Sequence, residues 1–245
     1  MVSEPLHGFV LHRRAYRETS YLTDLFTLEM GKISTVVRGV RGNKGDKKSL
    51  LQSFQPLLFS VSGKHELRNL NQLESNGKML NLGGHQLFCA MYLNELLNRL
   101  LPKEVPHPEL YEYYFQSLIL LQSDCEVEPC LRQFELILLD ELGYGIDLLH
   151  DFETNQPVKP DVDYCLVLEQ GVTAIGSGSI GSNRFSGQSL IAMTNDNWTT
   201  DSLKCAKYIT RTALAHLLGH KPLKSRELFQ QTWTKSGFRK SEELK

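Results

Sequence analysis

The sequence lacks the features that define several large classes of protein. Its five cysteines are scattered and odd in number, and no CxxC pair occurs, which argues against a disulfide framework and against a structural zinc site of the usual spacing. No apolar run approaches the roughly 18 residues that a membrane span needs. The first residues do not form a basic start followed by an apolar stretch. We therefore expect a cytoplasmic protein with reduced thiols and no membrane partner.

Catalytic motifs are also missing, since the sequence contains no P-loop, HExxH motif or nucleophile elbow. Gly176, Gly178 and Gly181 have the GxGxxG spacing, but Asn183 to Phe185 separate them from the next predicted helix. A dinucleotide-binding loop opens directly into a helix within a βαβ unit. A Ser/Gly-rich loop is therefore favoured over a nucleotide site, and we predict a protein that is not an enzyme and uses no cofactor or metal ion.

Charge is distributed unevenly along the chain. Residues 1–80 carry 12 Lys+Arg and 7 Asp+Glu, residues 81–200 carry 5 and 17, and residues 201–245 carry 10 and 4. Two basic ends around an acidic middle indicate polyanion binding at defined surfaces. Solvated charge without a partner is the alternative.

The residue pattern changes near residue 80. Before it, short segments with turn residues between them predict strands over 6–16, 20–28, 32–40, 55–64 and 66–75, and a small barrel of the OB-fold kind, while the polar segment 41–49 suits neither strand nor stable helix. After it, helices are predicted over 86–101, 109–122, 129–142, 186–193, 201–218 and 223–233, with a hairpin at 164–175 inside an irregular insertion at 146–185. We predict an α+β protein with a barrel domain at 1–80 and a helical domain at 81–245.

Basic side chains gather around one tyrosine in the first and third predicted strands and in the loop that follows. OB-folds hold single strands by combining a cationic groove with aromatic rings on which bases stack. A merely solvated Lys-rich loop is the alternative. The predicted nucleic-acid-binding residues are Arg13, Arg14, Tyr16, Arg17, Arg38, Arg41, Lys44, Lys47 and Lys48.

A second basic group lies on predicted helix 201–218 and the segment after it. Its helical members, spaced i, i+3 and i+7, form a stripe opposite Cys205 and Ile209. We predict a site for a second polyanion or an acidic peptide, with a solvated face as the alternative. The members are Lys204, Lys207, Arg211, Lys221, Lys224 and Arg226.

Several segments resemble the RecO family of bacterial recombination mediators, most closely the forms of enteric-type bacteria. The resemblance covers almost the whole chain. Its segments are FVLHRRAYRETSYLTDLFTLEMGKISTVVRGVR from Phe9, LNELLNRLL from Leu93, LRQFELILLDELGYG from Leu131 and GHKPLKSRELF from Gly219.

The resemblance implies an OB-fold joined to a helical domain that binds single- and double-stranded DNA and anneals complementary strands. It also implies partnership with RecR, contact with the acidic C-terminal tail of single-stranded DNA-binding protein (SSB), promotion of RecA loading on SSB-coated DNA, and a nucleoid-associated location. Nucleotide hydrolysis is not implied. Some members hold zinc on four cysteines in the region matching residues 146–175, where this chain offers only His150 and Cys165, so we expect no zinc.

An acidic tail with an apolar end requires an apolar pocket rimmed by cations. Arg132, Lys207 and Arg211 are the predicted rim, chosen by their location in the sequence. An RNA-binding OB-fold protein would share the basic barrel, and a scaffold would bind partners but no DNA. A strand-annealing assay separates these alternatives.

Overall fold

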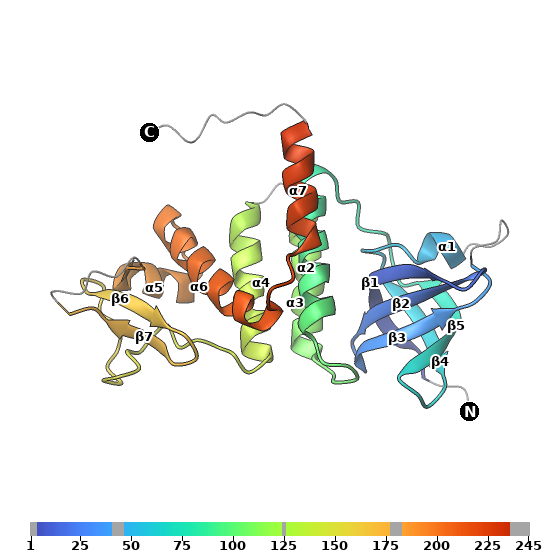
Figure 1. Ribbon diagram of the computed structural model, residues 1–245, viewed down its shortest axis with the longest axis horizontal. Helices are drawn as coiled ribbons and strands as arrows, with labels where there is room; N and C mark the ends of the chain where they lie inside the picture. Colours follow the sequence, from blue (N-terminus) through green and yellow to red (C-terminus); the bar gives the residue numbers. More distant parts are fainter. Residues whose placement is uncertain (1–3, 41–46, 124–125, 177–182, 236–245) are drawn as a thin grey trace. The chain divides into compact units, whose positions relative to one another are not determined.

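The computed structural model describes residues 4–40, 47–123, 126–176 and 183–235, with side chains up to residue 231. Its first part contains β1 (Leu6–Tyr16), β2 (Ser20–Thr27), β3 (Gly31–Val37), α1 (Lys47–Leu50), β4 (Leu57–Ser62) and β5 (Leu67–Ser75). The long helices α2 (Gly84–Leu100), α3 (Pro108–Gln122) and α4 (Val127–Glu141) follow (Figure 1). The last part contains β6 (Asp163–Val167), β7 (Gly171–Ala174), β8 (Phe185–Ser186), α5 (Gly187–Thr194), α6 (Thr200–Leu218) and α7 (Lys224–Lys235).

The N-terminal strands close into a barrel in the order β1-β2-β3-β5-β4, in which β3 and β5 run parallel and the other pairs antiparallel. Leu25 and Ile33 meet inside it, together with Leu57, Phe59 and Val61 of β4. These last three are the residues whose alternation predicted one inward face. The OB-like barrel followed by helices confirms the predicted α+β fold.

A bulge explains why β5 is harder to recognise from the sequence than β4. Phe59 pairs with Leu73 and Val61 pairs with Leu70, so a step of two residues along β4 corresponds to a step of three residues along β5. Such an extra residue shifts the alternation of the bulged strand. Leu70 and Leu73 therefore both enter the core although they are three positions apart, while Leu67 is 40% exposed.

The segment after β3 differs from its prediction. The expectation that residues 41–49 form no helix is wrong for Lys47–Ser49, which belong to the short helix α1, while residues 41–46 lie outside the described part. A turn this short has little stability of its own. Leu51, which follows it, is completely buried in the barrel core and anchors the turn.

Helices α2 and α3 pack against the outside of the barrel. Phe9 lies 5.3 Å from Tyr114, edge to face, and Phe26 lies 5.4 Å from Tyr111, both distances joining ring centroids. Burial, with Tyr111 close by, raises the pKa of the Tyr114 hydroxyl. That hydroxyl is therefore a hydrogen-bond donor at any physiological pH.

A second bulge is the point where barrel and helices share hydrogen bonds. The register of β1 shifts between Val10 and His12, which makes Leu11 the extra residue. The Asn94 side-chain amide donates to the carbonyls of Val10 and Leu11 at 3.3 and 3.5 Å, and accepts from the Tyr114 hydroxyl at 2.5 Å. The buried amide thus satisfies backbone carbonyls at the bulge.

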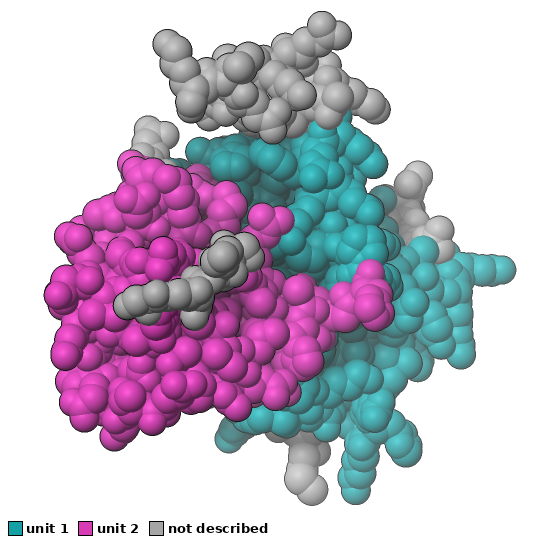
Figure 2. Space-filling model, turned by 60° about the vertical axis from the view of Figure 1, so that its left-hand side comes forward, with its two compact units in different colours: residues 1–125, 221–245 teal, residues 126–220 magenta. Residues whose placement is uncertain are grey.

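The chain divides into two compact units, coloured separately in Figure 2: unit 1, residues 1–125 and 221–245, and unit 2, residues 126–220. Unit 1 holds the barrel with α2, α3 and α7. Unit 1 carries 21 Lys+Arg and 15 Asp+Glu, a balance of +6, and unit 2 carries 6 and 13, a balance of −7. The division into domains at residue 80 stays a prediction.

Unit 2 packs α4, α5 and α6 with the small sheet β7-β6-β8. The predicted hairpin is confirmed by the pairing of β6 with β7, and Ser186 caps α5 by accepting from the Ser189 N–H. Helix α6 ends at Gly219 as predicted, and Cys205 and Ile209 of its apolar face lie in the core. Among the described residues, no helix has the length and apolar character to cross a bilayer.

Candidate nucleic-acid interface

The β1–β2 hairpin places two of the predicted binding side chains at its tip. Tyr16 pairs with Ser20 across the hairpin, and Arg17 between them has a φ of +51°. The Arg17 guanidinium lies over the Tyr16 ring, 5.2 Å from its centroid. Arg14 lies two residues before Tyr16 on the same side of β1, pairs with Leu22 of β2 and is exposed. An aromatic ring and two exposed cations therefore share this end of the barrel.

Arg13 does not belong to this exposed group. Its guanidinium donates to the Leu51 carbonyl at 2.7 Å, to the Gln52 side chain at 3.2 Å and to the Lys48 carbonyl at 3.4 Å. It also lies 5.5 Å from the centroid of the Tyr21 ring. Arg13 therefore fastens the segment around α1 to the barrel, in contrast to the predicted contact with nucleic acid.

The cations after β2 lie at the end of β3 and on α1. Arg38, Lys47 and Lys48 are exposed, and the Lys47 ammonium donates to the Asn71 carbonyl at 3.2 Å. Among the described residues, no carboxylate forms an ion pair with Arg14, Arg38, Lys47 or Lys48. Arg41 and Lys44 lie outside the described residues. The uncompensated charge of this group is the property that phosphate binding requires.

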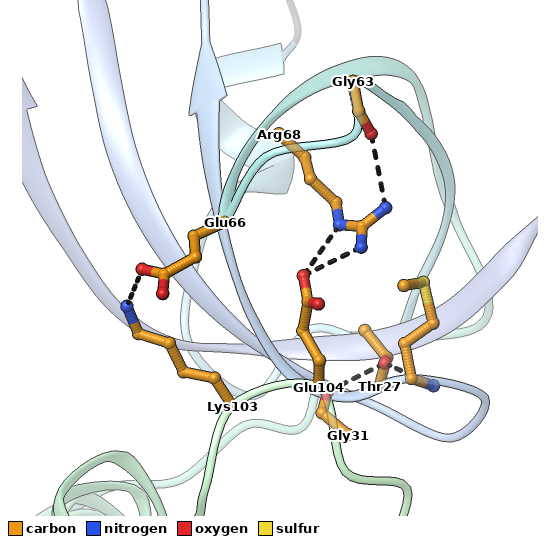
Figure 3. Close-up of polar contacts among 8 residues, drawn as sticks. Thr27, Gly31, Gly63, Glu66, Arg68, Lys103 and Glu104 are labelled. Atoms are coloured by element: carbon orange, nitrogen blue, oxygen red, sulfur yellow. Dashed lines mark hydrogen bonds and ion pairs between the residues drawn. The ribbon is translucent and has the colours of Figure 1, made fainter.

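The opposite end of the barrel is tied to the connection between α2 and α3 (Figure 3). Arg68 donates to Glu104 at 2.8 and 3.1 Å, and Lys103 pairs with Glu66 at 3.1 Å. Gly31, with φ +65°, approaches so closely that a Cβ would lie 1.8 Å from the Val105 carbonyl oxygen. Arg68 and Lys103 at this end are thus neutralised by carboxylates, and these contacts tie the β4–β5 loop, a binding loop in other OB-folds, to the connection between α2 and α3.

The basic residues after α6 join unit 1 because α7 packs on α2. The Glu95 carboxylate accepts from the backbone N–H groups of Lys224 and Ser225, both at 2.9 Å, and from the Ser225 hydroxyl at 2.8 Å. Arg99 donates to the Lys221 carbonyl at 2.9 Å. Glu95 and Arg99 thus hold the first turn of α7, a role that sequence reasoning did not assign to them.

The side chains of α7 divide between packing and solvent. Phe229 contacts Phe88 edge to face at 5.7 Å, and the Arg226 guanidinium lies 5.5 Å from the centroid of the Tyr92 ring. The exposed cations here are Lys221, Lys224 and Arg226. No acidic side chain in the described part of the chain forms an ion pair with any of them.

The predicted stripe on α6 lies in unit 2 and is largely neutralised. Lys204 pairs with Asp201 at 3.1 Å and Lys207 with Glu128 at 2.8 Å, while Arg211 is exposed. The three cations are therefore exposed on α6 as predicted from their spacing, but two of them already form ion pairs with carboxylates.

Arg132 does not lie beside them on the surface as predicted. It is 6% exposed and pairs with the completely buried Glu135 at 2.6 Å, and Thr210 of α6 donates to the same carboxylate. A buried cation is retained only with such a partner. Arg132 therefore joins α4 to α6 from within and does not form a rim.

Two pockets border α6. One, of about 280 Å³, is lined by Lys204, Cys205 and Tyr208, and the other has a volume of about 270 Å³. Ala213 and His216 line it together with Ile146, Leu168 and Glu169. His216 pairs with Glu169 at 3.1 Å. Its walls combine apolar side chains with the polar side chains of Glu169 and His216, and the predicted cations Lys207 and Arg211 are not among its lining residues.

Within the described ranges, no group of three or more His, Cys, Asp or Glu side chains is arranged to hold a metal ion. His150 pairs with Asp147 at 2.9 Å, and Cys165 lies half-buried in β6. Cys89, Cys130 and Cys205 are buried. Of the GxGxxG residues only Gly176 is described; Gly178 and Gly181 lie outside the described residues.

Comparison with known proteins assigns both parts of the chain. The family model for the recombination protein O N terminal matches residues 1–77, and that for the recombination protein O C terminal matches residues 83–227. A protein of Pseudoalteromonas atlantica named DNA repair protein RecO is 58% identical over 96% of this chain and 98% of its own length. Proteins of the same name from Alteromonas mediterranea and Vibrio cholerae are 44% and 43% identical, over 94% and 91% of this chain and 98% and 92% of their own lengths.

Proposed function

The chain belongs to the RecO family, with a role in DNA repair and recombination, and we propose that it performs this role by binding DNA on the barrel of unit 1 and annealing complementary strands. The observation that carries the proposal is the group of exposed cations Arg14, Arg38, Lys47 and Lys48 at the hairpin end of the barrel, for which no carboxylate partner occurs among the described residues. Phosphates of a single strand would replace solvent around these cations. Bases would stack on Tyr16 in place of Arg17.

The binding energy comes mainly from counterion release, which makes it insensitive to base sequence. Each neutralised phosphate of a single strand contributes about 0.7 to the slope of log affinity against log salt. The proposed contacts are Arg14, Arg17, Arg38, Lys47 and Lys48, so this surface supplies a slope near −3.5 by that relation. Arg41 and Lys44 stay proposed contacts from the sequence.

Annealing follows from the same charges. Two complementary strands repel each other through their phosphates, and a basic surface that screens one strand lowers the barrier to pairing without any covalent step. The chain therefore acts as a mediator and not as an enzyme. Double-stranded DNA, the product, is held through the same phosphate contacts.

The protein partners are proposed from the family. Lys207 and Arg211 on α6 are the proposed contacts for the acidic SSB tail. Lys207 would exchange its ion pair with Glu128 for one with the tail. Arg132 would hold α6 in place through its buried contacts with Glu135 and Thr210. The apolar end of the tail requires a pocket close to them. RecR binding and assistance to RecA on SSB-coated DNA complete the proposed role.

A strand-annealing assay tests the proposal against its alternatives. Wild-type protein should accelerate pairing of complementary DNA oligonucleotides, and the charge reversal Lys47→Glu/Lys48→Glu should abolish the acceleration. A matched reversal at Lys64 and Lys78, which are exposed elsewhere in unit 1, should retain most of it. An RNA-binding protein would favour RNA strands in the same assay, and a scaffold would accelerate neither; either result contradicts the proposal.

A further inference from the structure

The two units differ in how their cations are compensated, not only in net charge. In unit 2, four of the six basic residues have carboxylate partners: Arg132, Arg184, Lys204 and Lys207. The unit as a whole has a balance of −7. A polyanion approaching unit 2 therefore meets repulsion and must displace internal ion pairs.

In unit 1, groups of at least three exposed cations without a carboxylate partner among the described residues occur in two places; Lys64 and Lys78 are exposed at separate positions in the sequence. One is the hairpin end of the barrel. The other is the α7 surface, which we define by Lys221, Lys224 and Arg226. Lys224 and Arg226 lie in the first turn of α7, and Lys221 precedes the helix by three residues. The unit that displays them has a balance of +6.

Hydrogen bonds attach the backbone of the α7 surface to α2. The Glu95 carboxylate accepts hydrogen bonds from the backbone N–H groups of Lys224 and Ser225. It therefore caps the helix and does not neutralise the lysine side chains. Arg99 binds the Lys221 carbonyl and leaves the ammonium of Lys221 exposed. The backbone is fixed by α2 while the cations point to solvent, an arrangement that lowers the ordering cost of a phosphate contact.

We propose that the α7 surface is a second phosphate-binding surface for single-stranded DNA and that unit 2 contributes no phosphate contacts. This inference rests on the proposed function, because it extends the DNA-binding surface of the barrel to a helix at the other end of the sequence. It also divides the basic residues predicted near the C-terminus. Lys221, Lys224 and Arg226 bind DNA, and Lys204 does not.

The test is the salt dependence of single-strand binding, measured by fluorescence anisotropy with a labelled mixed-sequence oligonucleotide. The variant Lys221→Gln/Lys224→Gln removes two contacts, so the slope should become shallower by about 1.4 and affinity at 0.1 M salt should fall about 25-fold. Both ammonium groups are exposed and the backbone bonds of these residues are retained, so the fold should not change. The variant Lys221→Arg/Lys224→Arg should keep the wild-type slope.

The matched control is Lys159→Gln/Arg184→Gln in unit 2, which removes the same total charge from exposed positions. Its slope should equal that of the wild type. An unchanged slope in Lys221→Gln/Lys224→Gln, or an equal loss in the control, would overturn the inference while leaving the proposed function intact. A wild-type chain that does not bind the oligonucleotide would overturn both.

Discussion

Replacing Arg13 by alanine should destabilise the barrel end, whereas replacing its neighbour Arg14 should weaken DNA binding alone. Arg13 donates to Leu51, Gln52 and Lys48 and lies over the Tyr21 ring. Hydrogen bonds from a charged group contribute about 1.5–3 kcal/mol, and a cation–π contact at a partly exposed site about 0.5–1 kcal/mol. The expected loss of unfolding free energy for Arg13→Ala is therefore about 2–4 kcal/mol.

Urea denaturation of Arg13→Ala and Arg14→Ala measures this difference. Arg14 is exposed and forms no ion pair with a carboxylate in the described part of the chain, so Arg14→Ala should change stability by less than about 0.5 kcal/mol. It should make the salt slope of single-strand binding shallower by about 0.7, which is about fivefold in affinity at 0.1 M salt. Arg13 would instead be a DNA contact if Arg13→Ala unfolds at the wild-type urea concentration and makes the salt slope of single-strand binding shallower by about 0.7. That result would refute its assigned structural role.

Three further predictions concern stability. Tyr114→Phe leaves the buried Asn94 oxygen without its donor and should cost about 1–3 kcal/mol in urea denaturation; a cost near zero would contradict the assigned bond. Glu135→Ala leaves the Arg132 cation buried and unpaired and should cost about 3–5 kcal/mol, while Arg132→Met/Glu135→Leu should be neutral or stabilising; equal costs would contradict the buried pair. Partial burial alone raises the pKa of Glu95, but hydrogen bonds from Ser225 and Lys224, with Arg99 nearby, outweigh it and hold the pKa below its ordinary value of 4.5. Glu95 therefore stabilises the fold fully above pH 4.5, and this contribution is lost as pH falls through the lowered pKa. Glu95→Gln should flatten the pH dependence of the thermal unfolding temperature in that range. An unchanged pH profile would contradict the role of Glu95 as a helix cap.

The barrel strands were predictable because their alternation directly records which side chains enter the core. Leu57, Phe59 and Val61 all point inward as the pattern requires. The same rule was ambiguous for β5, because a bulge changes the spacing and no local signal marks it. Helix α1 was missed for a related reason, since its stability depends on contacts with distant residues such as Arg13.

The candidate site was predictable as a set of basic residues but not as an arrangement. Arg13 and Arg14 look alike in the sequence, yet adjacent positions on a strand face opposite sides, and only Arg14 faces solvent. The sequence around Arg132 is compatible with a surface position, but in the folded chain Arg132 is buried and donates to Thr210 of α6. The return of α7 to unit 1 depends on Glu95 and Arg99, more than 120 residues earlier in the chain, and no local pattern encodes such a contact.

The salt dependence of single-strand binding by the wild-type protein tests the central claim most directly. With five phosphate contacts on the barrel and three more on the α7 surface, log affinity should fall with log salt at a slope between about −3.5 and −5.6. Oligonucleotides of different base sequence should give the same slope and similar affinity at fixed salt. A flat salt response, or strong discrimination between base sequences at fixed salt, would contradict the account.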